Sequence, residues 1–358
     1  MHKTFKSTKA VKKNEKKINS SENLSSLISR ASLTYKKNFS DECTFERAIF
    51  LSWYCSKGDC KFCFMSTQKD KIKKVPLNLA KRRIESLITE AIICRELGWN
   101  IEFLSGGYDS YSTDELVNIA RKISIVYGKK LWLNTGLLTN DQIRRLRPHT
   151  EGICGSIECL DPRLHADMCP SKPIEPIADM LIVAKSLRLK AGITIIIGLG
   201  ESIKDFALLK DFIKKYDIDR ITFYALNPHE STIFKSGPKP GYYAEWIALT
   251  RINFPKLEII AGSWVDRLSE ISLLLNAGAN NITKFPSTSM FNSKFAEEIE
   301  NQVRIADRRF IGTLTKLPRF DWNKIVDKLP AKEFNDDLKG RIKIKILSYI
   351  KMMKKKKK

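Results

Sequence analysis

The chain has 358 residues, a length that allows one barrel-sized domain or two smaller ones. It contains no apolar run of about 18 residues and no apolar segment at its start, so we expect neither a membrane span nor a secretory signal and predict a cytoplasmic location. Its eight cysteines are too sparse for a disulfide scaffold, and unpaired thiols in a reducing compartment indicate metal binding or catalysis.

The net charge of +23 is concentrated at the two ends of the chain. Residues 1–20 hold seven lysines and one glutamate, and residues 341–358 hold nine lysines or arginines and no acid, so these ends carry 15 of the 23 charges. Such charge blocks are typical of solvated, disordered tails. Between them, aromatic and basic residues are not regularly interleaved, so we do not expect nucleic-acid binding to be the main function.

Three cysteines directly follow the first apolar run, residues 48–52, which we expect to be a strand. Cys55, Cys60 and Cys63 share one loop with small, charged and glycine residues. Three thiolates on one loop suit a [4Fe–4S] cluster, and a cluster held by only three of them keeps one iron free for a substrate or cosubstrate. A structural zinc site, which normally takes four ligands from two separated pairs, and a loop without metal are the alternatives.

Short apolar runs alternate with segments of helical period along most of the chain. The expected strands are residues 48–52, 101–105, 131–134, 152–158, 193–198, 221–226, 257–262 and 281–285. Segments with apolar residues three and four apart separate them, among them residues 77–97, 113–127, 174–187, 202–216 and 266–276. This alternation predicts parallel βα units, and eight of them fit a closed α/β barrel of the (β/α)8 type better than an open sheet.

We therefore predict three regions. Residues 1–40 are expected to form a flexible basic extension, residues 41–318 the barrel, and residues 319–358 a helical appendix that ends in a disordered basic tail. In barrels of this type the functional residues lie at the carboxyl ends of the strands. The cysteine loop follows the first strand, as this rule requires.

With its cysteine loop at a barrel mouth, the chain resembles the radical S-adenosylmethionine (radical SAM) superfamily. The signature of that superfamily is CxxxCxxC with an aromatic residue before the last cysteine. This sequence reads CxxxxCxxC, with Phe62 in the aromatic position and one extra residue between Cys55 and Cys60. The resemblance implies that Cys55, Cys60 and Cys63 hold a [4Fe–4S] cluster whose fourth iron binds SAM.

Further segments resemble the SAM-binding parts of the superfamily. A Gly-Gly segment follows the second strand with Tyr108 where the superfamily has Glu, and a GxGE-like turn follows the fifth. In the fourth strand, two polar residues that are two positions apart share one face. The resemblance implies that SAM binds to Phe62, Ser105, Gly106, Gly107, Asn134, Ser156, Glu158, Gly198 and Gly200.

Within the superfamily, the chain resembles the biotin-synthase-like group, because residues 277–280 read Ala-Gly-Ala-Asn. Biotin synthase holds a second cluster. The positions that correspond to the ligands of that cluster fall here near Phe103, Trp132, Gly192 and Ser263, and none of these residues can replace the ligand. Four other cysteines are candidates for an auxiliary cluster, with Cys43 folding over the mouth; the alternative is that they are small buried hydrophobes. These candidates are Cys43, Cys154, Cys159 and Cys169.

Our leading functional hypothesis is sulfur insertion at an unactivated carbon, as in the archaeal two-protein lipoyl synthases that the chain resembles. The expected partners are a small-molecule or lipoyl-carrier-protein substrate, an electron donor such as ferredoxin, and a second radical SAM chain. The alternatives are a maturase or cofactor-assembly enzyme and a zinc-stabilised nucleic-acid-binding protein. No conventional catalytic side chain is predicted, because the cofactors carry the chemistry.

Other residues near the predicted strand ends are weaker candidates. Lys284 and Arg267 are candidates for binding a substrate carboxylate or phosphate, unless Arg267 simply pairs with Asp266 or Glu270. His165 and His229 either act near the substrate or have surface and capping roles.

Overall fold

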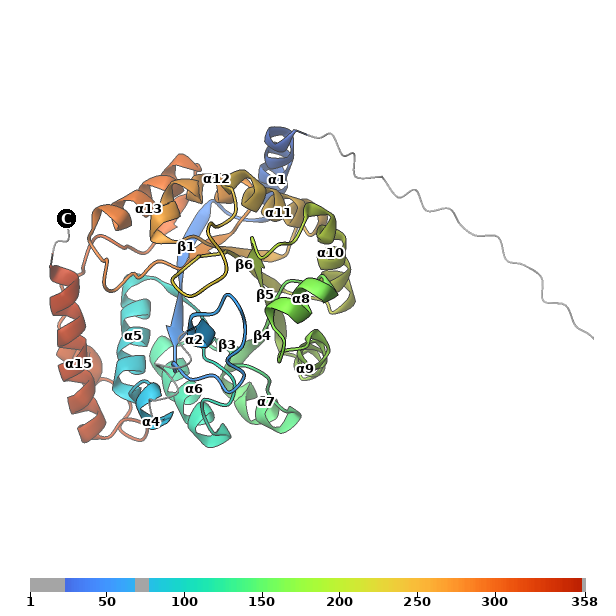
Figure 1. Cartoon of the computed structure of the whole chain (residues 1–358). Helices are drawn as coiled ribbons and strands as arrows, with labels where there is room; N and C mark the ends of the chain where they lie inside the picture. The colour runs from blue at the N-terminus through green and yellow to red at the C-terminus, as the bar shows by residue number, and fades with distance from the viewer. Residues whose placement is uncertain (1–22, 68–76, 356–358) are drawn as a thin grey trace, which may run out of the picture.

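The structure, a computed structural model, describes residues 23–67 and 77–355. Eight parallel strands form a closed barrel, because β1 pairs with β2 on one side and with β8 on the other (Figure 1). The predicted fold is confirmed. The strands are β1 Glu42–Phe50, β2 Asn100–Ser105, β3 Leu131–Asn134, β4 Thr150–Glu158, β5 Lys190–Ile197, β6 Arg220–Ala225, β7 Glu258–Gly262 and β8 Asn281–Thr283, and β9 Arg309–Ile311 pairs with β1 outside the barrel.

Helices surround the strands (Figure 1). In the described parts of the chain none of them is long and apolar enough to cross a bilayer. The α-helices are α1 Leu24–Asn38, α2 Phe64–Thr67, α4 Leu77–Ala80, α5 Ile84–Leu97, α6 Thr113–Tyr127, α7 Asn140–Leu146, α8 Pro162–Met168, α9 Ile174–Ser186, α10 Phe206–Lys215, α11 Pro240–Asn253, α12 Ile271–Asn276, α13 Lys294–Ile305, α14 Trp322–Asp327 and α15 Asp336–Lys354.

Local sequence signals account for several of these bounds. Helix α6 begins after Ser112, whose side chain caps the Glu115 amide while the Glu115 carboxylate accepts from the Ser112 amide. Helix α5 ends at Gly98, which adopts the left-handed conformation that favours glycine. The segment 77–97 was predicted as one helix, but it divides into α4 and α5 because Lys81 forms an isolated bridge with Ser52.

The first strand begins six residues before its predicted start. Thr44 and Glu46 point into the barrel, where the Glu46 carboxylate accepts hydrogen bonds from Thr44, Asn100 and Asn281. Polar residues on the inward face interrupt the apolar pattern from which strands are predicted. The sequence pattern therefore identified only the apolar end of β1.

The first described helix contradicts the prediction of a flexible extension for residues 24–38. Leu27, Ala31 and Tyr35 recur every four residues, are buried, and form the face of α1 that packs on α11. The basic residues Lys36 and Lys37 lie in the last turn of α1, where positive charge favours the helix dipole. Positive charge in this segment thus accompanies a packed helix.

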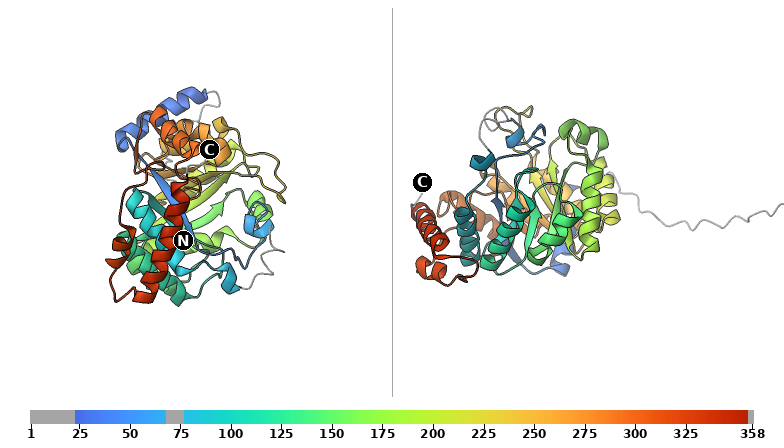
Figure 2. Two further views of the ribbon diagram at one scale, coloured as in Figure 1. Left: turned by 90° about the vertical axis from the view of Figure 1, so that its left-hand side faces the viewer. Right: turned by 90° about the horizontal axis from the view of Figure 1, so that it is seen from below.

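Helix α15 likewise replaces part of the predicted disordered basic tail. Its buried residues are Leu338, Ile342, Ile346, Ile350 and Met353, spaced three and four apart. This apolar stripe packs along α5 on the outside of the barrel (Figure 2). The helical period was present in the sequence, but the lysines between the apolar positions led to the wrong prediction for residues 341–354.

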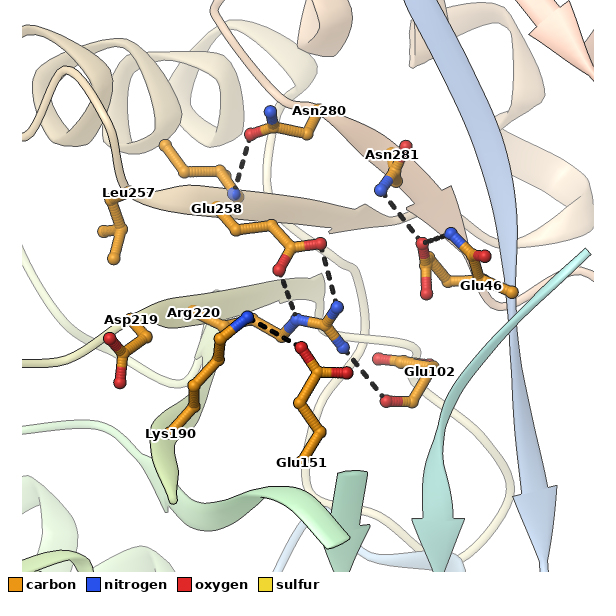
Figure 3. Close-up of polar contacts among 12 residues, drawn as sticks. Glu46, Glu102, Glu151, Lys190, Asp219, Arg220, Leu257, Glu258, Asn280 and Asn281 are labelled. Carbon is orange, nitrogen blue, oxygen red and sulfur yellow. Dashed lines mark hydrogen bonds and ion pairs between the residues drawn. The ribbon is translucent and has the colours of Figure 1, made fainter. Parts of the chain in front are cut away.

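A polar network fills the amino-terminal end of the barrel interior (Figure 3). The Arg220 guanidinium donates to both carboxylate oxygens of Glu258 at 2.8 Å and to the Glu102 carbonyl at 3.2 Å. The Trp132 ring lies 4.4 Å from the Arg220 guanidinium. A Cβ at Gly152 or Gly192 would lie 2.5 or 2.8 Å from this ring, so these glycines make room for it. The Trp132 ring and the ion pair thus occupy the amino-terminal end of the interior.

Glu90 connects the C-terminal helix to the barrel. Its buried carboxylate accepts hydrogen bonds from Arg47 on β1, Arg82 before α5, and the Tyr349 hydroxyl on α15. Burial alone would raise the pKa of Glu90, but the two guanidinium groups more than reverse this effect, so the pKa is lowered. The ionised form therefore stabilises the fold.

We predict that Glu90→Gln lowers the free energy of unfolding by about 3 kcal/mol, because it leaves two partly buried guanidinium groups without a counter-charge. The wild-type advantage is present above the unfolded-state pKa of about 4.3 and is lost as the pH falls through the lower folded-state pKa. Urea unfolding at pH 7 and at pH 3 measures both effects. Ile344→Ala, at a site 74% exposed on α15, is the control and should change stability little.

Candidate active site

The segment that follows β1 lies across the open end of the barrel, with α2 in front of the strands (Figure 1). Its three cysteines line one cavity together with the ends of β2, β3 and β4. The structure thus brings the predicted metal ligands together with most of the predicted SAM residues, whose binding roles stay predictions. The predicted residues on this cavity are Cys55, Cys60, Cys63, Phe62, Gly106, Gly107, Asn134, Ser156 and Glu158.

Backbone hydrogen bonds hold the cysteine loop in place. The Ser56 amide donates to the Tyr108 carbonyl at 3.1 Å, which connects the loop to the segment after β2. The Lys61 amide donates to the Met168 carbonyl at 3.0 Å, which connects it to α8. The loop is therefore fixed on both sides of the barrel mouth.

Gly107 allows the cysteine loop to approach β2. A Cβ at this position would lie 2.3 Å from the Tyr54 carbonyl oxygen and 2.5 Å from the Cys55 Cβ. Both distances are far below van der Waals contact, so any side chain here would push the loop away. A Cβ at the neighbouring Gly106 would lie 3.8 Å from its nearest neighbour, the Leu51 Cβ, which is an ordinary contact distance.

The three thiols line one cavity without meeting at one point. Within residues 23–67 and 77–355, no three His, Cys, Asp or Glu side chains converge to hold a single metal ion. A zinc ion needs its ligands around one centre, whereas a [4Fe–4S] cluster takes each thiolate at a different iron. Three thiols on one cavity are enough to supply one ligand to each of three irons of such a cluster.

Cys169 lies next to the cysteine loop. A hydrogen bond with Cys169, followed by burial, raises the pKa of the Cys60 thiol, and Cys60 and Cys169 pack in the same apolar cluster as Phe62. Burial also raises the pKa of the Cys63 thiol. Metal binding must therefore displace protons from buried thiols, as is usual for thiolate ligands.

A buried ion pair lines the same cavity as the cysteines. The Lys172 ammonium lies 2.9 Å from one Glu158 carboxylate oxygen, and the Thr194 hydroxyl donates to the other at 3.3 Å. Burial lowers the pKa of Lys172, but the Glu158 carboxylate more than reverses this effect, so the pKa is raised. The pair places one fixed positive and one fixed negative charge on the cavity wall.

Lys172 was not predicted, because it lies in a polar loop 14 residues after Glu158 without any motif around it. Its position depends on His165, which is buried. One ring nitrogen of His165 lies 3.0 Å from the Cys159 carbonyl oxygen and the other 2.7 Å from the Lys172 carbonyl oxygen. His165 thus connects the two segments that carry the ion pair, and it has a structural role.

Two further contacts complete the walls of the cavity. The Ser156 hydroxyl donates to the Asn134 side-chain oxygen at 2.8 Å, which joins the ends of β3 and β4. His229 lies outside the cavity wall, with a ring nitrogen 3.3 Å from the Phe62 carbonyl oxygen and its ring against Phe64. His229 therefore contacts the back of the cysteine loop.

Three of the predicted SAM residues do not line this cavity. Ser105 faces a second cavity beside β1. Gly198 and Gly200 lie in a turn whose backbone amides donate to the Glu201 carboxylate, so this turn is closed by its own side chain. Leu199 in the same turn packs with Phe62, which makes the turn a neighbour of the cavity and not part of it.

The four candidate cysteines for an auxiliary cluster do not come together. Cys43 is fully buried at the amino-terminal end of β1, where it pairs with Phe310 of β9, so the prediction that it folds over the mouth is wrong. Cys154 packs inside the barrel with Trp132. Only Cys159 and Cys169 share an apolar cluster. The direction of β1 explains the error, since a residue before its start lies at the far end of the barrel.

The two cations considered for substrate binding differ in their surroundings. Arg267 already forms an ion pair with Glu270 at 2.5 Å, so it is engaged within the protein. Lys284 lies over the Tyr224 ring and lines the second cavity. Only Lys284 thus stays a candidate for substrate binding.

The sequence profile of the Radical SAM superfamily matches residues 53–213, which begin just before the three cysteines and end within α10. The chain belongs to the radical SAM superfamily. Membership of this superfamily implies that the cofactors are a [4Fe–4S] cluster and SAM.

This radical SAM enzyme is similar to curated proteins of two organisms. It is 40% identical over 328 residues to an uncharacterized protein of Methanocaldococcus jannaschii, which covers 88% of the chain and 90% of that protein. It is 22% identical over 272 residues to the 3-methylornithine synthase of Methanosarcina barkeri, covering 74% of the chain and 76% of the synthase.

Two solved structures share the fold. Methylornithine synthase (PylB) matches with a TM-score of 0.64 and 20% identity, covering 86% of this chain and 87% of that one. The FeFe-hydrogenase maturase HydG from Carboxydothermus hydrogenoformans matches with a TM-score of 0.64 and 16% identity. The match covers 92% of this chain and 82% of that one. These likenesses support the barrel and its closed arrangement of strands.

We predict that Gly107→Ala prevents uptake of the cluster, because the added Cβ displaces Cys55 from the cavity. The measurement is the iron content of the chain after anaerobic reconstitution. Gly106→Ala is the matched control, since its Cβ meets only an ordinary contact, and it should retain iron at the wild-type level. Equal iron contents in the two variants would show that the close approach at Gly107 is not required.

Proposed function

We propose that Cys55, Cys60 and Cys63 hold the [4Fe–4S] cluster of this radical SAM enzyme and that SAM binds in the cavity beside them. The observation that carries this proposal is that three thiols, two glycines and a buried ion pair line one cavity at the barrel mouth. When bound, the cluster and SAM supply the radical that removes hydrogen from a substrate carbon.

The side chains of the cavity then have separate tasks. Gly106 and Gly107 let the backbone approach the bound cosubstrate without a side chain between them. Lys172 and Glu158 offer a positive and a negative group to a zwitterionic amino acid moiety, which the methionine part of SAM carries. Phe62 and the apolar residues of its cluster exclude water from the reacting groups.

We further propose that the reaction is a step of cofactor assembly or of amino acid synthesis, and not sulfur insertion. Sulfur insertion requires a sulfur donor, and of the four cysteines considered for an auxiliary cluster only Cys159 and Cys169 pack together. The named relatives, a 3-methylornithine synthase and a hydrogenase maturase, support the same choice. The substrate is proposed to be a small molecule.

The electron donor is proposed to be a small acidic iron–sulfur protein such as a ferredoxin. Lys57 lines the cavity of the cysteines, and the half-exposed Trp53 lies beside the cysteine loop. Positive charge near the cluster site steers an acidic partner towards it.

We predict that Cys60→Ala loses the cluster and all production of 5′-deoxyadenosine from SAM, whereas Cys169→Ala keeps both. The two thiols are neighbours, so this pair of variants separates a ligand from an adjacent buried thiol. Iron content and 5′-deoxyadenosine are measured after anaerobic reconstitution with SAM and reductant. SAM cleavage by Cys60→Ala would refute the proposed ligand set.

The same reconstitution tests the reaction class. A single [4Fe–4S] cluster corresponds to about four irons per chain, and a second cluster adds two to four more. We expect about four irons in the wild-type chain. A count near eight, reduced by Cys159→Ala, would restore the sulfur-insertion hypothesis.

A further inference from the structure

A second cavity, of about 430 Å³, opens beside the interior of the barrel between β1 and β8. These two strands pair only at Phe45 with Ile282 and at Glu46 with Thr283. Strand β1 continues to Phe50, whereas β8 ends at Thr283, so the barrel wall is open above this level. Lys284, the first residue after β8, lies at this opening.

The backbone of Lys284 directs its side chain over the barrel mouth. Its φ angle is +75°, in the left-handed region that residues other than glycine seldom adopt. Strained backbone of this kind persists where the surrounding structure enforces it, and it is common at ligand sites. Gly262 lacks the Cβ that would meet both the Tyr224 ring and the Lys284 side chain, which leaves room for them.

Two immobile aromatic rings hold the ammonium group. It lies 4.3 Å from the centre of the Tyr224 ring and 5.8 Å from that of Trp264. The Tyr224 hydroxyl donates to Glu102 at 2.6 Å and the Trp264 indole donates to the Ala225 carbonyl at 2.8 Å, so neither ring is free to turn. The positive charge is therefore presented at a fixed place.

Lys284 differs from the other cations around the barrel interior. Lys172, Arg220 and Arg267 each pair with a carboxylate, respectively Glu158, Glu258 and Glu270. Lys284 forms no ion pair or hydrogen bond with any residue in the described ranges 23–67 and 77–355. A half-buried ammonium without a counter-charge has an electrostatic reason to bind an anion.

A hydrogen-bond donor accompanies this charge. Ser105 lines the same cavity, and within the described residues its hydroxyl has no hydrogen-bond partner. The next residue, Gly106, lines the cavity of the cysteines, so both cavities reach the end of β2. A molecule held at Lys284 and Ser105 would extend towards the proposed SAM site.

We infer that Lys284, assisted by Ser105, binds the carboxylate group of the substrate. This inference rests on the proposed function, since it concerns the second molecule in the same barrel. One ammonium and one hydroxyl match a singly charged carboxylate. A phosphate with its higher charge is usually held by an Arg fork or several backbone amides, and the arginine that lines this cavity, Arg47, is already paired with Glu90.

The test uses the full chain, reconstituted anaerobically and supplied with SAM and reductant. Production of 5′-deoxyadenosine is measured alone and with each of a panel of acids: the protein amino acids, L-ornithine, octanoate and dethiobiotin. Each acid is compared with its carboxamide, which has the same shape without the charge. We expect at least one acid to stimulate production and its carboxamide to fail.

Variants then assign the response to Lys284. Lys284→Met keeps the length and the backbone strain but removes the charge, and it should raise the acid concentration for half-maximal stimulation about 10-fold or more. Lys284→Arg should retain most of the response. Lys256→Met, an exposed lysine at the opposite end of the barrel, is the matched control and should respond as the wild type does.

The inference is overturned if the carboxamide stimulates as well as the acid, if Lys284→Met responds as the wild type does, or if no acid stimulates while slow substrate-independent SAM cleavage continues. That last result leaves the proposed function intact. Absence of SAM cleavage in the iron-loaded wild-type chain would instead contradict the proposed function, and the inference with it. Iron content and circular dichroism establish that the variants are folded.

Discussion

The close approach of the cysteine loop to the end of β2 is the constraint on which the site depends. Gly107 permits it, because any side chain there would overlap the Tyr54 carbonyl and Cys55. Closure of the barrel between β1 and β2 brings these two strand ends together, and the hydrogen bond from Ser56 to Tyr108 holds them. The cavity therefore follows from strand pairing and from one missing Cβ.

The charged groups at the two ends of the barrel interior differ in their surroundings. At the amino-terminal end Arg220, Glu102 and Glu258 form a hydrogen-bonded network (Figure 3). The Trp132 ring packs against Arg220, in the room left by Gly152 and Gly192. This level is filled, and its buried charges are largely compensated, as burial requires. At the mouth, by contrast, the Glu158–Lys172 pair and the Lys284 ammonium face cavities. Binding groups are thus concentrated where space is available.

Much of this arrangement could be predicted from the sequence. Apolar runs and helical periods gave eight strands in the correct order, with β3 and α6 at their observed bounds, and the cysteine spacing marked the loop at the mouth. Polar inward-facing residues hid the start of β1, and dense lysines masked the apolar stripe of α15. Lys172 and Lys284 acquire their roles only through the fold: one from a buried partner 14 residues away, the other from a backbone turn and two distant rings.

The central claim is that the cluster held by the three cysteines keeps an iron open to SAM within this cavity. Electron paramagnetic resonance of the reduced, reconstituted chain, recorded before and after addition of SAM, tests it most directly. We expect a signal of a reduced [4Fe–4S] cluster whose shape changes when SAM binds. A cluster signal that excess SAM leaves unchanged would contradict the account.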